Sequence, residues 1–467
     1  MSDIQSAIVQ GKTTCVEVVS AYQDRIQVFD KASGLNAITV LNPDALDEAA
    51  ILDERISRGE LIGPVFSGPL LVKDNIDTVG LETTGGSSML KGHPSSRDAF
   101  IIEQLSARGA IIIAKTNMAE WAFSPRQTLS CSFGRTANAY ALDRVPAGSS
   151  GGTASGIAAS FAVLGIGTDT GNSIRGPASH LSLFGLRPTL GLVSRMGIVP
   201  LVFDRDIAGP LTRTVADGAR LLTAMAAVDS ADSYSLDPGR PTGVDYLEAV
   251  DPEGLTGRRI GVLRALVKPE DTDPEILSLF NAALRDMEKA GAVIVDPVAI
   301  DNFTAHQEAD NFCPRFGYDL QVYLSARFGG MFRSTWPTFW HWEHMARIRG
   351  FGIHLNTSRI SLQMSHHVTG VHPVPTLISI QAARLSARMS LPRLMLHSST
   401  QLSIQPGFSR PLPLLGPTKP MAATTVRRFL LRLDCLPQPF RWAGKQTGSP
   451  WAFNSWLVLG LKMFCLP

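Results

Sequence analysis

Short apolar runs alternate with amphipathic runs along the first 330 residues of this chain. Amphipathic runs, with apolar residues three and four positions apart, predict helices over residues 14–29, 44–55, 99–108, 214–226 and 274–290. Compact apolar runs between them predict strands over residues 36–41, 69–73, 110–114, 161–166, 259–263 and 292–295. This alternation favours an α/β fold, with a sheet covered by helices on both faces.

Charge is distributed unevenly along the chain. The net charge of the 467 residues is only +2, yet residues 331–467 hold fifteen Lys and Arg against two acidic residues, Glu343 and Asp434. Seven of the ten His also follow residue 328, and no window there keeps a helical or alternating pattern. We therefore expect a folded α/β domain over residues 1–326 and an atypical basic region, rich in Pro, Ser and His, over residues 327–467.

Three origins are open for the region 327–467. A frameshift or a misplaced exon boundary would change the composition in this way, and the region would then be poorly ordered. A divergent folded segment is a second origin, and a basic arm for nucleic acid or an anionic membrane is a third. Such arms are usually dense in Lys and poor in apolar residues, whereas this region keeps Trp, Phe, Leu and Met throughout. We therefore expect no nucleic-acid partner.

Other features bear on location and cofactors. Five Cys without a Cys-x-x-Cys pair predict neither a disulfide framework nor a zinc site, and they favour a reducing compartment. The pair His341 and His344 lacks a third ligand, so no metal is expected. The polar N-terminus lacks the order of a signal peptide, and the late apolar run 456–461 is far shorter than the about 20 residues that span a bilayer. We expect a cytoplasmic protein without a membrane span.

Three polar residues, Lys73, Ser149 and Ser173, lie in loops suited to chemistry. Lys73 and the Gly-rich loop 167–173 both follow predicted strands, and an α/β sheet places its sites at the carboxyl ends of strands. Glycines there and in Gly148-Ser-Ser-Gly-Gly152 let backbone N–H groups approach a ligand. Such groups beside a serine can hold an oxyanion, an effect worth roughly 3–4 kcal/mol per donor. No His stands near these loops, but a neutral lysine could activate a serine.

These motifs resemble those of the amidase signature family. The resemblance is carried by residues 148–159, by Gly165-x-Gly-Thr-Asp-x-Gly-x-Ser-Ile-Arg175, and by further blocks in the family's order at residues 69–75, 115–120, 185–189 and 209–217. It covers residues 1–326. It implies that these residues form an amidase catalytic domain, a single large α/β domain with a mixed sheet. It also implies a Ser-Ser-Lys amide hydrolase that uses no cofactor.

The resemblance assigns roles residue by residue. Ser173 would be the acylated nucleophile, Ser149 the bridging serine and Lys73 the base. The backbone N–H groups of residues 170–173 would form an oxyanion hole, and Asp169 and Arg175 would brace that loop. Together with the acyl channel, which includes Trp121 and Phe123, this gives a set of substrate-facing residues: Ala122, Ser149, Thr170, Gly171, Asn172 and Ser173. The chain departs from the family at Ala147 and Asn172, where Gly is usual.

The relay requires a neutral lysine. Lys73 would take the proton of Ser149 while Ser149 takes that of Ser173, which attacks the amide carbonyl. Because a lysine with its ordinary pKa of about 10.4 is charged at pH 7, burial must lower the pKa of Lys73. Asp74 would raise that pKa, so we expect Asp74 to face away. The resemblance also implies a cis peptide bond in the serine pair, which we place between Ser149 and Ser150.

The predicted reaction is hydrolysis of a monocarboxylic acid amide to a carboxylate and ammonia or an amine, through an acyl-serine. Its partner is a small-molecule amide, and a homodimer is left open. One alternative is a catalytically inactive amidase-like protein with a binding or structural role, suggested by the region 327–467. Another is an α/β-hydrolase-type esterase, because Ser150 also fits Gly-x-Ser-x-Gly, with His180 as base. The segment 143–146 before it is not typical of a buried strand, which disfavours that elbow.

Overall fold

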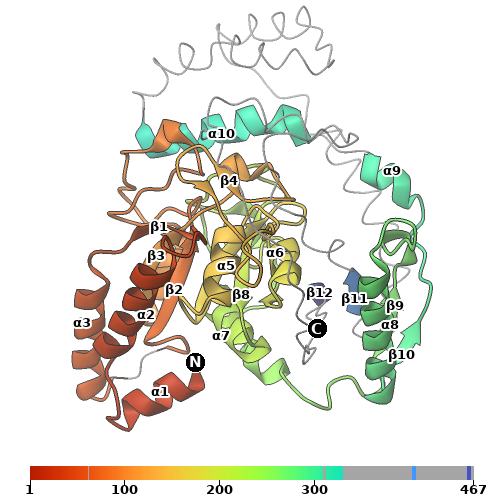
Figure 1. Cartoon of the computed structure of the whole chain (residues 1–467), viewed down its shortest axis with the longest axis horizontal. Helices are drawn as coiled ribbons and strands as arrows, with labels where there is room; N and C mark the ends of the chain where they lie inside the picture. The colour runs from red at the N-terminus through yellow and green to blue at the C-terminus, as the bar shows by residue number, and fades with distance from the viewer. Residues whose placement is uncertain (61–62, 309–311, 330–401, 406–459, 464–467) are drawn as a thin grey trace, which may run out of the picture. The chain divides into compact units, whose positions relative to one another are not determined.

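The computed structural model describes residues 1–60, 63–308, 312–329, 402–405 and 460–463 (Figure 1). Most of the region 327–467, including His341 and His344, lies outside these residues. A six-stranded sheet organises the described part, in the order β1-β3-β2-β6-β8-β7. Its strands are β1 (Ile38–Leu41), β2 (Gly68–Lys73), β3 (Ala110–Thr116), β6 (Leu164–Asp169), β7 (Phe184–Gly185) and β8 (Ile207–Thr212).

Strand β2 lies at the centre of this sheet and runs parallel to both of its neighbours, β3 and β6. The outer pairings, β1 with β3, β6 with β8, and β8 with β7, are antiparallel. The prediction of a mixed sheet is therefore confirmed.

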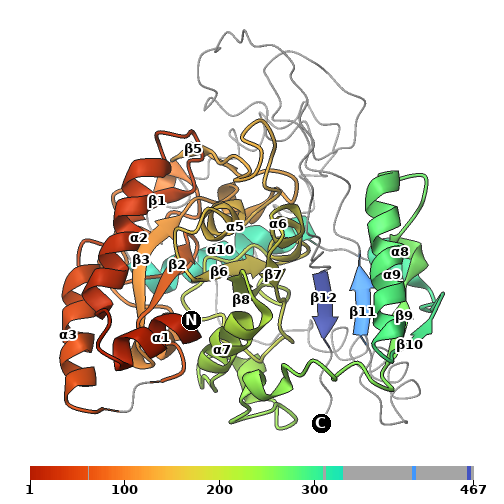
Figure 2. The ribbon, with the colours of Figure 1, turned by 60° about the horizontal axis from the view of Figure 1, so that its bottom comes forward.

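Both faces of the sheet are buried under helices, which explains why its strands are apolar throughout. Successive side chains of a strand point to opposite faces. Leu70 and Val72 accordingly belong to one core cluster and Leu71 to the other. The first cluster contains residues of α4 (Phe100–Ala107) and α7 (Val215–Met225). The second contains residues of α2 (Cys15–Phe29), α3 (Ala45–Ser57), α5 (Gly151–Ala158) and α6 (Arg175–His180), with α2 and α3 packed side by side (Figure 2).

Helix starts follow the local sequence closely. Thr14 caps α2 with a complete capping box, in which its side chain accepts from the N–H of Glu17 and its own N–H donates to the Glu17 carboxylate, both at 3.1 Å. Thr214 caps α7 by accepting from the N–H of Asp217 at 3.1 Å. Asp217 also pairs with the amino group of Met1 at 3.2 Å, which connects α7 to α1 (Ser2–Val9).

The strand predicted over residues 161–166 is displaced in the structure, because β6 begins at Leu164 and continues to Asp169. Its glycines are required by the close approach of helix α5. A Cβ on Gly165 would lie 2.8 Å from the Thr153 side chain, and one on Gly167 would lie 2.8 Å from the Ser150 hydroxyl. The sequence pattern indicated that the strand ends near these glycines, but in the structure both glycines are part of β6.

A second sheet has the order β10-β9-β11-β12, and a short antiparallel pair joins β4 (Leu129–Ser130) to β5 (Gly134–Arg135). Two short strands, β11 and β12, lie in the region that follows residue 328. Their pairing with β9 and with each other is long-range, which a local pattern does not reveal. The remaining elements are β9 (Arg259–Val262), β10 (Val293–Val295), β11 (Leu402–Gln405), β12 (Gly460–Met463), α8 (Pro274–Lys289), α9 (Phe303–Glu308) and α10 (Phe312–Phe328).

Cysteine usage was interpreted incompletely from the sequence. Cys15 is free and buried, but Cys131 is disulfide-bonded, although we expected no disulfide framework. Spacing along the chain does not show which thiols meet in space. Within the described ranges, no helix is both long enough and apolar enough to cross a membrane.

Candidate active site

Lys73 is the last residue of β2, beside the parallel strand β6. Val72 lies opposite Ile166, a register that places the lysine next to Thr168 near the end of β6. The Nζ of Lys73 donates to the Oγ of Ser149 and to the Oγ1 of Thr168, both at 2.7 Å. Lys73 and Ser149 are both fully buried. The sheet thus holds an amine against a serine hydroxyl without contact with solvent.

Burial dominates the acid–base behaviour of this lysine. It lowers the pKa of Lys73 from 10.5 to about 7, although the charges of Asp169 and Asp206 act in the opposite direction. Asp74 is directed elsewhere: its carboxylate accepts from the N–H groups of Thr84 at 3.2 Å and Gly86 at 3.1 Å. This agrees with the expectation that Asp74 faces away from Lys73.

The serine pair bridges the sheet and the loop after β6. The cis peptide bond joins Gly148 to Ser149, so our placement of it after Ser149 was wrong. Ser150 is instead the N-cap of α5, and the bond that leads into it belongs to the start of that helix. The carbonyl of Ser149 accepts from the N–H of Ala119 at 3.0 Å, and the N–H of Ser150 donates to the carbonyl of Ser173 at 3.3 Å. The three loops that carry Lys73, Ser149 and Ser173 are therefore brought together.

The geometry does not support Ser150 as an esterase nucleophile. Its hydroxyl donates to the carbonyl of Thr168 at 3.1 Å and accepts from the N–H of the same residue at 3.2 Å. These bonds fix Ser150 to the backbone of β6. The segment 143–146 before it forms no strand, as expected, and the Nδ1 of His180 lies 3.4 Å from the carbonyl of Val145.

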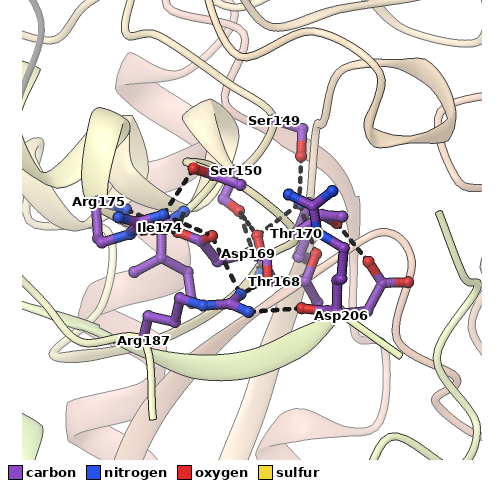
Figure 3. Close-up of polar contacts among 12 residues, drawn as sticks. Ser149, Ser150, Thr168, Asp169, Thr170, Ile174, Arg175, Arg187 and Asp206 are labelled. Atoms are coloured by element: carbon purple, nitrogen blue, oxygen red, sulfur yellow. Dashed lines mark hydrogen bonds and ion pairs between the residues drawn. The ribbon is translucent and has the colours of Figure 1, made fainter. Parts of the chain in front are cut away.

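The loop after β6 is held by a buried carboxylate. Asp169 accepts from the N–H of Ile174 at 3.1 Å and pairs with Arg175 at 3.1 Å and Arg187 at 3.2 Å (Figure 3). Burial would raise the pKa of Asp169, but the two guanidinium groups outweigh burial and hold the pKa below its ordinary value. Arg175 also donates to the carbonyl of Gly171 at 2.6 Å. The contacts expected of Asp169 and Arg175 as braces of the loop are present.

A second carboxylate, Asp206, reaches the same loop from the segment before β8. Its Oδ1 accepts from the hydroxyl of Thr170, and its Oδ2 accepts from the N–H groups of Leu201 at 2.7 Å and Val202 at 3.0 Å. Burial raises the pKa of Asp206 to about 6, although these three hydrogen bonds and the charge of Lys73 lower it. Sequence analysis missed Asp206, because it belongs to no predicted element and lies 33 positions after Ser173.

The two departures from the family pattern differ in backbone conformation. Ala147 has φ +61°, in the left-handed region that favours glycine, so its side chain is strained there. Asn172 is not among the residues with positive φ, and its side chain donates to the carbonyl of Pro125 at 3.5 Å. A side chain at position 172 therefore requires no left-handed backbone.

The remaining residues expected at the site differ in their exposure to solvent. Ser173 is buried, with 4% of its surface exposed, whereas Gly171 is exposed. Ala122 is buried in the segment that follows Ala119, and its neighbours Trp121 and Phe123 both stack edge-on against Phe316 of α10, at 6.1 and 4.8 Å between ring centroids. In the described ranges, no group of three or more His, Cys, Asp and Glu could hold a metal ion.

Sequence analysis missed several further residues around Lys73. Asn75 donates to the hydroxyl of Thr168 at 3.0 Å, and Arg187 donates to the carbonyl of Asp169. Thr168, Asn75 and Arg187 all lie in motif blocks that carried the family resemblance. Membership of those blocks was the signal that could have identified them.

Comparisons with known proteins show the family and the fold of this chain. The family model named Amidase matches residues 17–336. A glutamyl-tRNA(Gln) amidotransferase subunit from Thermosynechococcus vestitus is 38% identical over 323 residues, 69% of this chain and 63% of that protein. The corresponding protein from Alkaliphilus metalliredigens is 41% identical over 308 residues, 65% of this chain and 61% of that protein. The chain thus spans less than two thirds of the length of these curated relatives.

Solved structures show the same fold. Native peptide amidase from Stenotrophomonas maltophilia has a TM-score of 0.70 and 33% identity, with 86% of this chain and 82% of that chain covered. An amidase family protein from Bacillus anthracis has a TM-score of 0.71 and 30% identity, with 87% and 80% covered. The fold predicted from the motifs is confirmed, and the chain belongs to the Amidase family.

Proposed function

We propose that this protein hydrolyses a carboxamide through an acyl-enzyme on Ser173, with Ser149 and Lys73 as a proton relay. The observation that carries the proposal is the 2.7 Å contact between Lys73 Nζ and Ser149 Oγ in a fully buried position. With a pKa of about 7, Lys73 is neutral in a large fraction of molecules at pH 7, so it can accept a proton.

The proposed proton path begins at the contact between Lys73 and Ser149. Ser149 gives its proton to Lys73 and takes the proton of Ser173, whose oxygen then attacks the amide carbon. The same two groups return a proton to the departing nitrogen, so ammonia or an amine leaves neutral. Water then hydrolyses the ester on Ser173, releasing the carboxylate and restoring the serine.

The loop 170–173 is the proposed oxyanion hole. Backbone N–H groups suit this role only if they are fixed before the reaction, because reorganising them costs part of the stabilisation. Asp169 holds the loop at Ile174 and Asp206 holds it at Thr170, which supplies such fixation. We place the acyl part of the substrate near Ala122, beside the aromatic cluster of Trp121, Phe123 and Phe316, which favours an apolar acid.

A second candidate is an amidotransferase component that releases ammonia from a carboxamide donor for use by a partner. The identity of 38% to a glutamyl-tRNA(Gln) amidotransferase subunit favours it. The chemistry at Ser173 is the same in both candidates. They differ in substrate: the amidotransferase candidate predicts a strong preference for a side-chain carboxamide such as that of glutamine, and the peptide amidase of known structure suggests a peptide amide.

A fluorophosphonate probe tests the proposed nucleophile. Wild-type protein should be labelled at Ser173, and Ser173→Ala should abolish labelling, whereas the exposed Ser57→Ala should leave it unchanged. Lys73→Met should slow labelling at pH 7 by at least about 100-fold, and the exposed Lys289→Met should not. Failure of well-folded wild-type protein to react would favour the catalytically inactive alternative. Ammonia release from acetamide, a dipeptide amide and glutamine then ranks the substrates.

A further inference from the structure

Asp206 is a buried carboxylate that contacts the proposed oxyanion loop. One of its carboxylate oxygens accepts from the hydroxyl of Thr170 in the proposed oxyanion loop. The other accepts from two backbone N–H groups, at Leu201 and Val202, which fix the carboxylate in place. Asp206 is buried, with 5% of its surface exposed, and its charge and that of Lys73 act on each other.

The charged groups around this pair come from several elements. The charge of Asp169, at the end of β6, raises the pKa of Lys73 more than that of Asp206 does, and Asp169 also pairs with Arg175 and Arg187. Arg187 also interacts with Asp206, though more weakly than with Asp169. On the β3 side, Lys115 interacts chiefly with Asp74 and Asp77. Asp206 is thus a carboxylate that contacts the oxyanion loop and whose charge acts on Lys73.

We propose that Asp206 is a positioning residue for the proposed reaction: its carboxylate fixes Thr170 in the oxyanion loop, and its negative charge acts on Lys73. This inference rests on the proposed function only for its effect on rate. The electrostatic effect on Lys73 exists whether or not the protein turns over an amide. Removing the charge must make the protonated lysine less stable, so Lys73 loses its proton at lower pH.

Asp206→Asn is the appropriate variant, because an amide can satisfy the same three partners. Its oxygen can accept from Leu201 and Val202 while its nitrogen donates to the Thr170 oxygen. Only the charge is then lost. Asp204→Asn is the matched control, two residues away, since Asp204 pairs with Arg315 at 2.8 Å and both side chains are 38% exposed. Thr170→Val removes the hydrogen bond and keeps the carboxylate.

The experiment measures two quantities on the full chain. The first is the protonation midpoint of Lys73, followed by NMR of protein with ¹³C at lysine Cε and assigned by the loss of its signal in Lys73→Met. The second is the rate of fluorophosphonate labelling of Ser173 against pH. Asp206→Asn should lower the protonation midpoint of Lys73 by about 0.5–1 pH unit, and the pH at which the labelling rate falls on the acid side should decrease by the same amount. Asp204→Asn should change neither quantity. Thr170→Val should reduce the labelling rate about tenfold at its optimum.

An unchanged or raised midpoint in Asp206→Asn would overturn the proposal, as would an undiminished labelling rate in Thr170→Val. If wild-type protein is not labelled, the proposed function fails while the NMR midpoint still decides the electrostatic role. If Asp206→Asn does not fold, Asp206→Glu takes its place. That variant keeps the charge, so the protonation midpoint of Lys73 should stay within about 0.3 pH unit of the wild-type value, while labelling of Ser173 should slow. A midpoint lowered by about 1 pH unit would contradict the proposal.

Discussion

The side-chain nitrogen of Lys73 and the hydroxyl oxygen of Ser149 lie 2.7 Å apart, and neither residue is exposed to solvent. The nitrogen of a neutral lysine has one lone pair that can accept a proton, whereas the nitrogen of a protonated lysine has none. The protonation state of Lys73 therefore decides whether a serine can be deprotonated here.

The rate of acylation should rise with pH through a midpoint near 7. Burial lowers the pKa of Lys73 to about 7, and only the neutral amine accepts a proton, so acid must inhibit and mild base must activate. Single-turnover acylation measured from pH 5.5 to 8.5 tests this expectation. A rate independent of pH across that range would exclude Lys73 as the base.

Asp169→Asn should destabilise the fold by about 3 kcal/mol or more, because it leaves Arg175 and Arg187 without their shared buried partner. Asp143→Asn breaks only an exposed pair with Arg144 and should change stability by less than about 1 kcal/mol. Urea unfolding at pH 7 compares the two variants. Because the pKa of Asp169 is lowered in the folded state, its contribution is present at neutral pH and lost as the pH falls toward that pKa. Equal losses in the two variants would contradict this account.

Tyr323→Phe should weaken the attachment of α10 to the loop that follows Lys73. The hydroxyl of Tyr323 donates to the carboxylate of Asp77 at 2.8 Å and accepts from Arg327 at 3.0 Å, all in buried surroundings. We expect a loss of about 1–3 kcal/mol in the free energy of unfolding. Tyr318→Phe, on the same helix but 68% exposed, should have no measurable effect. If the two substitutions are equivalent, the buried hydrogen bonds do not hold the helix.

Gly152→Ala should destabilise the protein by about 1–3 kcal/mol, since a Cβ there would lie 2.2 Å from the carbonyl oxygen of Asn117 and 2.8 Å from that of Ala37. Gly317→Ala is the matched helical control. A Cβ at that position meets no atom within 4 Å, so the change should be neutral or stabilising by up to about 1 kcal/mol. Thermal melting of both variants gives the comparison, and a stable Gly152→Ala would refute the close packing of α5 on β3.

Elements encoded by adjacent residues were predictable from the sequence. The capping box at Thr14 and the apolar run of β2 are local signals, and both elements appear close to their expected places. Strand β8 was missed because Pro210 lies within it, opposite Ile166, although proline is usually excluded from central strands. Helix α10 was missed because the contacts that hold it, such as Tyr323 with Asp77, join residues 246 positions apart.

The residues of the candidate site also fall into two groups, those that local sequence motifs indicate and those that only the fold brings near. Lys73, Ser149 and Ser173 lie in motif blocks, so the family resemblance was sufficient to propose them as site residues. Asp206 has no such signal, and its contact with Thr170 exists only because β8 pairs with β6 and returns the chain to that loop. Residue types can be recognised along a sequence, but electrostatic neighbours depend on which strands become adjacent.

A second buried lysine, Lys115, lies on β3 opposite Val72, so the neighbouring strands β2 and β3 each carry one desolvated amine. Burial lowers the pKa of Lys115 to about 8 and that of Lys73 to about 7, whereas both amines bind a proton up to about pH 10.5 once the chain unfolds. From pH 7 to 8.5 the unfolded chain therefore holds more protons at these two positions, and each lysine makes unfolding less favourable as the pH rises. Above that range the Cys15 thiol, whose pKa burial raises to about 12, acts in the opposite direction. The contribution of the two lysines to the free energy of unfolding is thus more favourable at mildly alkaline pH than at pH 7, and the proposed base is also free of its proton there.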